Sequence, residues 1–238
     1  MSLQFISTDF NIAILIISVV LFYYLYYYFS SSIFPKNYLK KNGNNELLLF
    51  LARKISGFLI LGVIPLILYI IFFDFSFYKF GFTGSQLKSN FSIILILISI
   101  VALVTLINQK VNAQRNSLQL KLKEWTIFLF TLNSFGWIIY LIGYEFLFRG
   151  ILLYECYYNF GLWPAIAINV AIYSAIHMIN GKDEAFGALL FGTIACYFTL
   201  SRGTILIPIF MHISLSLFSD YFSILLNKNL SFIKKTDP

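Results

Sequence analysis

The residues best suited to chemistry lie between positions 140 and 220 of the 238-residue chain. Here ionisable side chains fall within or beside long apolar segments, and they are Glu145, Arg149, Glu155, His177, Glu184, His212 and Asp220. Such groups cost on the order of several kcal/mol in an apolar medium unless they are paired or face a cavity. We therefore treat each of them as a candidate for function, and both histidines of the chain belong to the set.

The local sequence suggests a structural role for two of the acidic candidates, Glu145 and Glu184. Glu145 and Arg149 are four positions apart, so on a helix they share one face and can pair directly. Taken alone, this spacing also fits a simple ion pair at the edge of a membrane. Glu184 opens an apolar segment just after Gly181-Lys182-Asp183. Its carboxylate can either stabilise the start of a helix through the helix dipole or belong to a site.

The two histidines differ in how readily packing explains them. His177 ends an apolar segment, where a lone histidine is often only a packing residue. His212 follows Gly203 by nine positions, which is about 13 Å along a helix and near the middle of a membrane. Ser216 and Asp220 continue from His212 at i+4 and i+8 and form one polar stripe. Alternatively, Asp220 marks only the cytoplasmic end of that helix.

These residue types suit hydrolysis by activated water. A buried carboxylate can act as a general base towards water, and an imidazole can share that water, bind a metal or stabilise an oxyanion. No serine or cysteine shows a local nucleophile signature. The cofactor stays undetermined: two histidines and one carboxylate suffice for a three-ligand zinc site, although the chain contains no His-Glu-x-x-His motif.

The elements that must position these groups are predicted to be transmembrane helices. The chain is 59% hydrophobic and 11% charged, with a mean hydropathy of +0.81, whereas soluble domains carry about 25% charged residues. A spanning helix needs roughly 17–25 mostly apolar residues. Seven stretches without Asp, Glu, Lys or Arg meet this requirement: Phe10–Pro35, Ile55–Phe73, Ser89–Gln109, Trp125–Tyr144, Cys156–Gly181, Ala185–Ser201 and Gly203–Ser219. We expect an all-α polytopic helical bundle of about seven spans.

The net charge of +7 follows from the predicted loops and requires no nucleic acid partner. The loop and tail residues that carry it are Lys36, Lys40, Lys41, Arg53, Lys54, Lys110, Arg115, Lys121, Lys123, Lys182, Lys228, Lys234 and Lys235. Their distribution predicts an external N-terminus and a cytoplasmic C-terminus. Residues Ser30–Lys54 are predicted to form a turn and an interfacial helix that leads into the second span.

We divide this single membrane domain into three parts. Residues 1–124 form N-terminal spans and loops, residues 125–226 form the helical core that carries the candidate site, and residues 227–238 form a basic cytoplasmic tail. The high content of Asn, Lys, Ile, Phe and Tyr is typical of an AT-rich genome and points to a bacterial cell (inner) membrane.

Three motifs of the core resemble the CPBP family of intramembrane proteases, the group of CAAX prenyl proteases and bacteriocin-processing or Abi-type proteins. The family pattern is Glu-Glu-x-x-x-Arg, then Phe-x-x-x-His, then His-x-x-x-Asn or Asp. The matching segments are Tyr144 to Gly150, Tyr173 to His177 and His212 to Ser216. The resemblance covers roughly residues 125–224 and implies an endopeptidase that uses a glutamate-activated water and two histidines.

The chain departs from the family pattern at two positions. Tyr144 stands where the first glutamate of the family, the one implied to activate water, is expected, and Ser216 replaces the usual amide or carboxylate. The first motif, Glu-Phe-x-Phe-Arg-Gly, is similar to a variant branch in which a glutamate near the start of the following helix and a late aspartate accompany the histidines. Glu184 and Asp220 fit those places.

The resemblance implies a role for each candidate. Glu145 or Glu184 is expected to supply the base, with Arg149 orienting Glu145. His177 and His212 are expected to frame the water and the oxyanion. The substrate is expected to be a membrane-anchored peptide or protein within the lipid bilayer.

Two other functions compete with this hypothesis. Because of Tyr144 and Ser216, the chain could instead be a catalytically inactive relative that serves as a membrane binding or immunity protein. The polar groups could also form the path of a transporter component. Against the transporter, the sequence shows no repeated halves with paired broken helices.

Overall fold

The computed structural model describes residues 2–32, 43–72, 76–80, 82, 84–112 and 118–233. Within these ranges the chain is built almost entirely from helices, which confirms the predicted all-α class. The helices are α1 (Ser2–Ser32), α2 (Gly43–Phe58), η2 (Leu59–Val63), α3 (Ile64–Phe72), η3 (Phe77–Phe80), α4 (Gly84–Val111), α5 (Ile127–Glu145), η4 (Phe146–Leu152), α6 (Leu153–Phe160), α7 (Leu162–His177), η5 (Met178–Asn180), α8 (Lys182–Arg202) and α9 (Leu206–Leu226). Two short strands, β1 (Glu124–Trp125) and β2 (Ser231–Phe232), pair in parallel.

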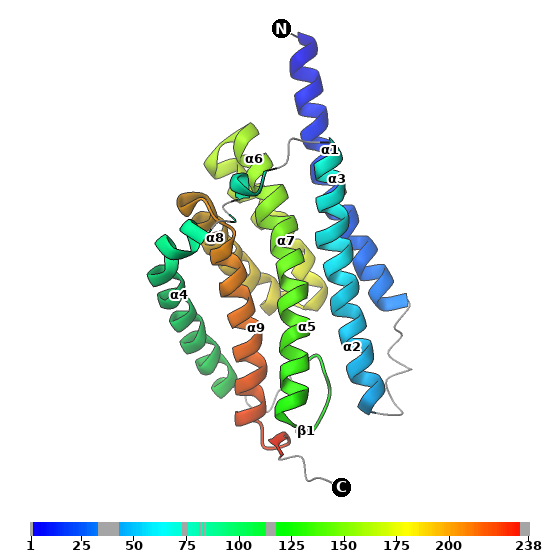
Figure 1. Cartoon of the computed structure of the whole chain (residues 1–238), viewed down its shortest axis with the longest axis vertical. Coiled ribbons are helices and arrows are strands. Elements are labelled where there is room, and N and C mark those ends of the chain that lie inside the picture. Colours follow the sequence, from blue (N-terminus) through cyan, green and yellow to red (C-terminus); the bar gives the residue numbers. More distant parts are fainter. Residues whose placement is uncertain are drawn as a thin grey trace.

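Seven helical runs of the described residues are long and apolar enough to cross a membrane, as predicted. They are Asn11–Ser31, Glu46–Phe72, Tyr78–Val111, Ile127–Phe160, Leu162–Asn180, Lys182–Arg202 and Leu206–Leu226. Their outer faces carry exposed apolar side chains such as Ile17, Ile96 and Val104, which suits contact with lipid. The start of α1 and the end of α9 lie at opposite ends of the bundle (Figure 1), as an odd number of spans requires. The chain is a multi-pass integral membrane protein.

The second span is longer than predicted because the residues assigned to an interfacial helix are part of the span itself. α2 continues through the π-helical η2 into α3, so one helix runs unbroken to Phe72. The residues predicted to lie along the membrane surface instead pack against α5, where Phe50 is buried. The predicted interfacial helix is therefore wrong. Most of the turn predicted before it, residues 33–42, lies outside the described residues.

Some of the basic residues assigned to loops do not lie in loops. Arg53 and Lys54 belong to the second span. Lys54 is buried, and its ammonium group lies over aromatic rings of α5. Other basic residues used for the predicted orientation lie outside the described residues, and they are Lys36, Lys40, Lys41, Arg115, Lys234 and Lys235. The orientation of the chain in the membrane therefore stays a prediction.

The fourth span carries Glu145 and Arg149 in its interior. The charge-free stretch predicted for this span ends at Tyr144, but the helix continues through η4 and α6. It ends at Gly161, whose φ of +81° is a conformation that residues with a Cβ rarely adopt. Glu145 and Arg149 pair with each other and are fully buried, so the two charges do not interrupt the span.

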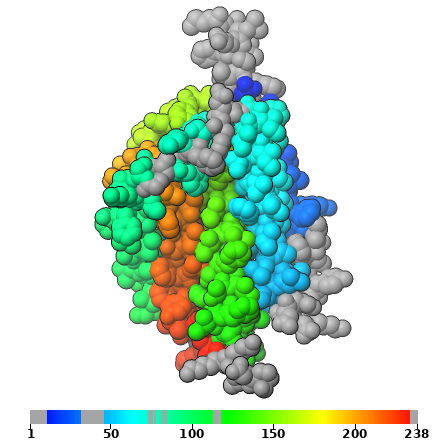
Figure 2. Space-filling view, viewed as in Figure 1, coloured from blue at the N-terminus to red at the C-terminus, as the bar shows by residue number. Residues whose placement is uncertain are grey.

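The helices that carry the candidate site pack around one another in the bundle. α7 packs against α8, while α9 contacts α5, α8 and α4. In the space-filling view, α9 and α5 lie side by side, with α4 on one flank and α2–α3 on the other (Figure 2). Two glycines let η2 and α5 approach closely, since a Cβ added to Gly62 would lie 2.9 Å from the Cα of Gly143. Gly143 directly precedes the candidate residues.

The end of the described chain packs back onto the start of the helical core. Ser231 donates a backbone hydrogen bond to Lys123, and Ile233 donates one to Trp125. Leu230 is buried beside the wholly buried Trp125. The remainder of the predicted basic tail, residues 234–238, lies outside the described residues.

Candidate active site

Glu145 and His212 are in direct contact in the interior of the bundle. His212 lies in the first half of α9, and its Nδ1–H donates a hydrogen bond of 2.5 Å to Oε1 of Glu145. The Glu145 side chain is fully buried, whereas the His212 side chain is 12% exposed. Because Nδ1 carries the donated hydrogen, Nε2 of the neutral imidazole holds the lone pair that can accept a proton.

Arg149 provides the counter-charge for Glu145. Its Nη1 atom lies 3.4 Å from Oε2 of Glu145, and both side chains are fully buried. The guanidinium carbon lies 4.0 Å from the centroid of the Tyr173 ring. Among the described residues, none of its three nitrogen atoms has a hydrogen-bond partner of good geometry. The ion pair with Glu145 and the stacking on Tyr173 therefore hold the guanidinium. In return, the guanidinium compensates the charge of the Glu145 carboxylate, whose burial without a cation would be strongly unfavourable.

The backbone that carries Arg149 forms a π-helical turn. In η4 the N–H of Leu153 donates to the carbonyl of Phe148, five positions earlier. The same carbonyl also accepts a hydrogen bond of 2.6 Å from Nδ2 of Asn169 on α7. Asn169 is fully buried and accepts a contact of 3.2 Å from the Cys196 thiol through its Oδ1. Short π segments are frequent at functional sites, and here the π turn is anchored to α7 and α8.

His177 is fixed by the backbone of its own helix. At the end of α7, its Nδ1–H donates a hydrogen bond of 2.8 Å to the carbonyl of Tyr173. Its ring also packs against the Tyr173 ring, with centroids 4.5 Å apart. As in His212, Nδ1 carries the hydrogen, so Nε2 is the nitrogen left to accept a proton or a hydrogen bond.

Tyr144 connects the two histidines. Its ring meets His212 edge to face at a centroid distance of 5.7 Å and His177 in the same way at 6.5 Å. The ring also stacks on Phe148 at 4.6 Å. Tyr144 is 3% exposed, and its Oη atom has no hydrogen-bond partner among the described residues. The structure thus brings together Tyr144, Glu145, Arg149, His177 and His212.

Glu184 and Ser216 do not join these contacts. Glu184 is exposed in the first turn of α8, and Ser216 is half-buried on α9. Neither side chain forms a hydrogen bond or an ion pair within the described part of the chain. The position of Glu184 matches the alternative role of a carboxylate at a helix N-terminus.

Asp220 belongs to a second buried cluster, which the sequence did not reveal as a unit. Its Oδ2 atom accepts hydrogen bonds of 2.8 Å from Asn133 and 2.9 Å from Trp137. Lys54 interacts with it electrostatically, and the Lys54 ammonium lies 3.0 Å from the centroid of the Trp137 ring. Asp220 is therefore buried and does not mark a solvated helix end. Polar Asn133 within an apolar stretch was the available signal.

A third polar group links Glu155 to the segment before α4. Tyr69 and Lys79 both donate hydrogen bonds to Oε1 of Glu155. These contacts tie η3 and α3 to α6. Glu155 thus has a structural partner set of its own.

The donors of the site are not arranged as a metal centre. Within the part of the chain that the structure describes, no group of three His, Cys, Asp or Glu side chains could hold a metal ion. The Nδ1 atoms of His177 and His212 are hydrogen-bonded to protein oxygens, so only Nε2 of each imidazole is left to bind a ligand.

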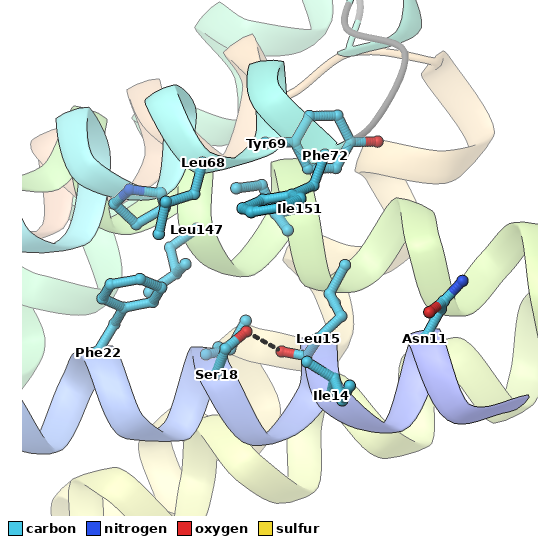
Figure 3. Close-up of a pocket in the computed structure, with 12 residues that line it drawn as sticks. Asn11, Ile14, Leu15, Ser18, Phe22, Leu68, Tyr69, Phe72, Leu147 and Ile151 are labelled. Atoms are coloured by element: carbon cyan, nitrogen blue, oxygen red, sulfur yellow. Dashed lines mark hydrogen bonds between the residues drawn. The ribbon is translucent and has the colours of Figure 1, made fainter. Parts of the chain in front are cut away.

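An apolar groove of about 450 Å³ lies between α1, α3 and η4 (Figure 3). Leu147 and Ile151 contribute its η4 wall, and Phe22, Leu68 and Phe72 face it from the other two helices. Its lining includes no carboxylate, imidazole or amine. The groove suits an apolar chain but offers no group that activates water, so the candidate chemistry rests with Glu145 and His212.

The segment that carries these residues matches a known protein family. Residues 123–218 match the family model described as type II CAAX prenyl endopeptidase Rce1-like. Neither the curated proteins nor the solved structures yielded a significant match. The matched segment runs from β1 through most of α9 and includes the five residues that meet around Glu145. The segment that carries the site is therefore similar to the Rce1-like type II CAAX prenyl endopeptidases, which supports the family predicted from the three motifs.

Proposed function

We propose that the protein is a CAAX-type intramembrane endopeptidase that cleaves a membrane-anchored peptide or protein with water activated by Glu145 and His212. The observation that carries this proposal is the buried hydrogen bond between these two residues. In this pair, Nε2 of His212 can accept a proton, and the Glu145 carboxylate stabilises the imidazolium that results. The family match over residues 123–218 supports a protease of this type.

In the proposed reaction, Glu145 acts on water through the imidazole of His212. The water oxygen bonds to the carbonyl carbon of the scissile peptide while its proton moves to Nε2 of His212. The Glu145 carboxylate stabilises the resulting imidazolium. When the tetrahedral intermediate collapses, the C–N bond breaks and the proton passes from Nε2 to the leaving nitrogen. The products are a carboxylic acid and an amine.

Arg149 and His177 support this step. Arg149 pairs with the buried Glu145 and orients it, because its guanidinium lies 3.4 Å from Oε2 and is itself held against Tyr173. His177 presents Nε2 as a second acceptor near the same tyrosine that His212 contacts. It can therefore hold the attacking water by accepting its second hydrogen.

Geometry favours Glu145 over Glu184 as the catalytic carboxylate. Glu145 is buried and bonded to an imidazole, so its charge acts in a medium that screens little. Glu184 is exposed and makes no hydrogen bond or ion pair within the described residues. We retain Glu184 as the variant that tests this choice.

The test is proteolysis by the purified full-length protein in proteoliposomes. The panel contains prenylated peptides that end in a CAAX motif, the same peptides without the prenyl group, and single-span membrane peptides. We expect wild type to cleave at least one of them. Glu145→Gln and His212→Ala should lower the rate by roughly 10²–10⁴-fold, whereas Glu184→Gln should retain it. Near-wild-type thermal unfolding of each variant shows that the loss is chemical.

The inactive membrane-binding relative remains the competing proposal, and a specific observation favours it. Tyr144 fills the position of the expected first glutamate, and no second carboxylate lies beside Glu145 among the hydrogen bonds and ion pairs of the described residues. Folded wild type that cleaves no member of the panel would support this function and reject the peptidase. The amino-acid composition leads us to propose a bacterial cell membrane as its location.

A further inference from the structure

The hydroxyl group of Tyr144 is buried, and nothing in the described part of the chain pairs with it. The residue is 3% exposed, and Oη lacks a hydrogen-bond partner among the described residues. Burying a hydroxyl without a partner costs free energy, and phenylalanine would fill the same space without that cost. A packing role for the ring therefore explains its aromatic contacts, but it does not explain why the residue carries a buried hydroxyl group.

The ring that carries this hydroxyl forms part of the candidate site. It meets the imidazoles of His177 and His212 at interplanar angles of 87° and 85°. It is held from the other sides by Phe148, with which it stacks, and by Tyr173, whose centroid is 5.9 Å away. A ring fixed by these aromatic neighbours keeps its hydroxyl oxygen in one place, which is a requirement for preorganised catalysis.

The other polar groups of the site are poorly placed to stabilise an oxyanion. The Nδ1 hydrogen of His177 is donated to a carbonyl, and that of His212 is donated to Glu145. In neutral imidazoles both Nε2 atoms are then acceptors. The guanidinium of Arg149 is fully buried, pairs with Glu145 at 3.4 Å and lies 4.0 Å from the centroid of the Tyr173 ring. Addition of water to a carbonyl nevertheless creates an oxyanion that needs a donor.

We propose that Tyr144 is a catalytic residue whose hydroxyl donates a hydrogen bond to the oxyanion formed at the scissile carbonyl. This inference rests on the proposed peptidase function. No bond to the tyrosine oxygen forms or breaks, and the phenol keeps its proton while the negative charge on the carbonyl oxygen develops and disappears. The tyrosine is then the oxyanion donor of this chain and not the cause of an inactive site.

The test compares Tyr144→Phe with Tyr140→Phe in the proteoliposome assay. Both changes remove one phenol oxygen, and the Tyr140 ring contacts Tyr144 at 5.7 Å but contacts neither imidazole. We expect Tyr144→Phe to lower kcat by roughly 10²–10³-fold with little change in KM. Its thermal midpoint should equal or exceed that of wild type, because no hydrogen bond is lost. Tyr140→Phe should keep kcat within about threefold.

A second measurement separates a catalytic hydroxyl from a structural one. A peptidyl phosphonate carries charged oxygens where the oxyanion forms, so its affinity should fall in Tyr144→Phe by about the factor seen in kcat/KM. Fluorotyrosine at position 144 keeps the ring and the hydroxyl but strengthens the donor. It should change kcat while leaving unfolding unaltered, and it covers the case in which Tyr144→Phe does not fold.

The two proposals fail in different ways. If wild type cleaves and folded Tyr144→Phe has the same kcat and the same phosphonate affinity, this inference is overturned while the peptidase stands. An unchanged kcat with fluorotyrosine at position 144 would overturn it as well. If wild type cleaves nothing in the panel, the proposed function fails and the inference fails with it.

Discussion

His212 on α9 donates a hydrogen bond of 2.5 Å from Nδ1 to Oε1 of Glu145, which ends α5 and lies 67 positions earlier in the chain. The contact joins two spans in the interior of the bundle. It fixes the histidine tautomer and leaves Nε2 as the acceptor. Arg149 lies on the other side of the same carboxylate, so one buried glutamate connects a cation and an imidazole.

The contact predicts that Glu145 and His212 act as one unit in catalysis. Replacing either residue should remove most of the rate, and the double variant should be hardly slower than the slower single variant. Single-turnover cleavage rates of Glu145→Gln, His212→Ala and the double variant measure this. Losses that multiply in the double variant would show that the two residues contribute independently.

Arg149 should contribute mainly to stability. Arg149→Met leaves a carboxylate buried without its cation, which costs about 3–5 kcal/mol. The double variant Arg149→Met with Glu145→Gln should recover much of that loss, because the uncompensated charge is gone. Denaturant unfolding in one detergent compares the two variants with wild type. Equal destabilisation of single and double variants would contradict the charge argument.

Much of the fold follows from hydropathy, because lipid requires every spanning backbone to satisfy its own hydrogen bonds. Charge-free runs predict the seven spans for this reason. The charge-free runs give the wrong span ends where a charged side chain is compensated inside the bundle. The fourth span continues through the paired Glu145 and Arg149, and the second span includes Lys54, which lies over the Trp137 ring. A search for uncharged runs ends at every charged residue, whether or not an ion pair or an aromatic ring compensates that charge.

The sequence named the five residues that meet in the structure, but it also named Glu184, Ser216 and Asp220, which lie apart from them, and it did not predict the contacts. The spacing of Glu145 and Arg149 predicts their pairing, which the structure contains. The partner of His212 depends on how α9 packs against α5, and no local pattern encodes that. Asp220 shares a helical face with His212 but lies eight positions further along α9, where it accepts hydrogen bonds from Asn133 and Trp137. Helical periodicity thus gave the shared face but not the partners that His212 and Asp220 meet on α5.

Glu184 should be dispensable for cleavage. It is exposed at the start of α8, so Glu184→Gln should retain activity within about threefold of wild type, as is usual for exposed substitutions away from a site. Cleavage rates of Glu184→Gln and Glu145→Gln, measured on the same substrate, provide the comparison. A large loss in Glu184→Gln with normal unfolding would make Glu184 the catalytic carboxylate and would require α8 to move during the reaction.

Asp220 should matter for stability and not for chemistry. In Asp220→Ala, Nδ2 of Asn133 and Nε1 of Trp137 lose their acceptor, and the buried Lys54 loses its nearby negative charge. Removing one member of such a buried group costs about 3–5 kcal/mol. Asp220→Asn is the matched control, because it keeps an acceptor oxygen and should be less destabilised. Unfolding and the cleavage rate per folded molecule are measured together. A normal unfolding midpoint with a lost rate would instead tie Asp220 to the catalytic step, through the helical face that it shares with His212.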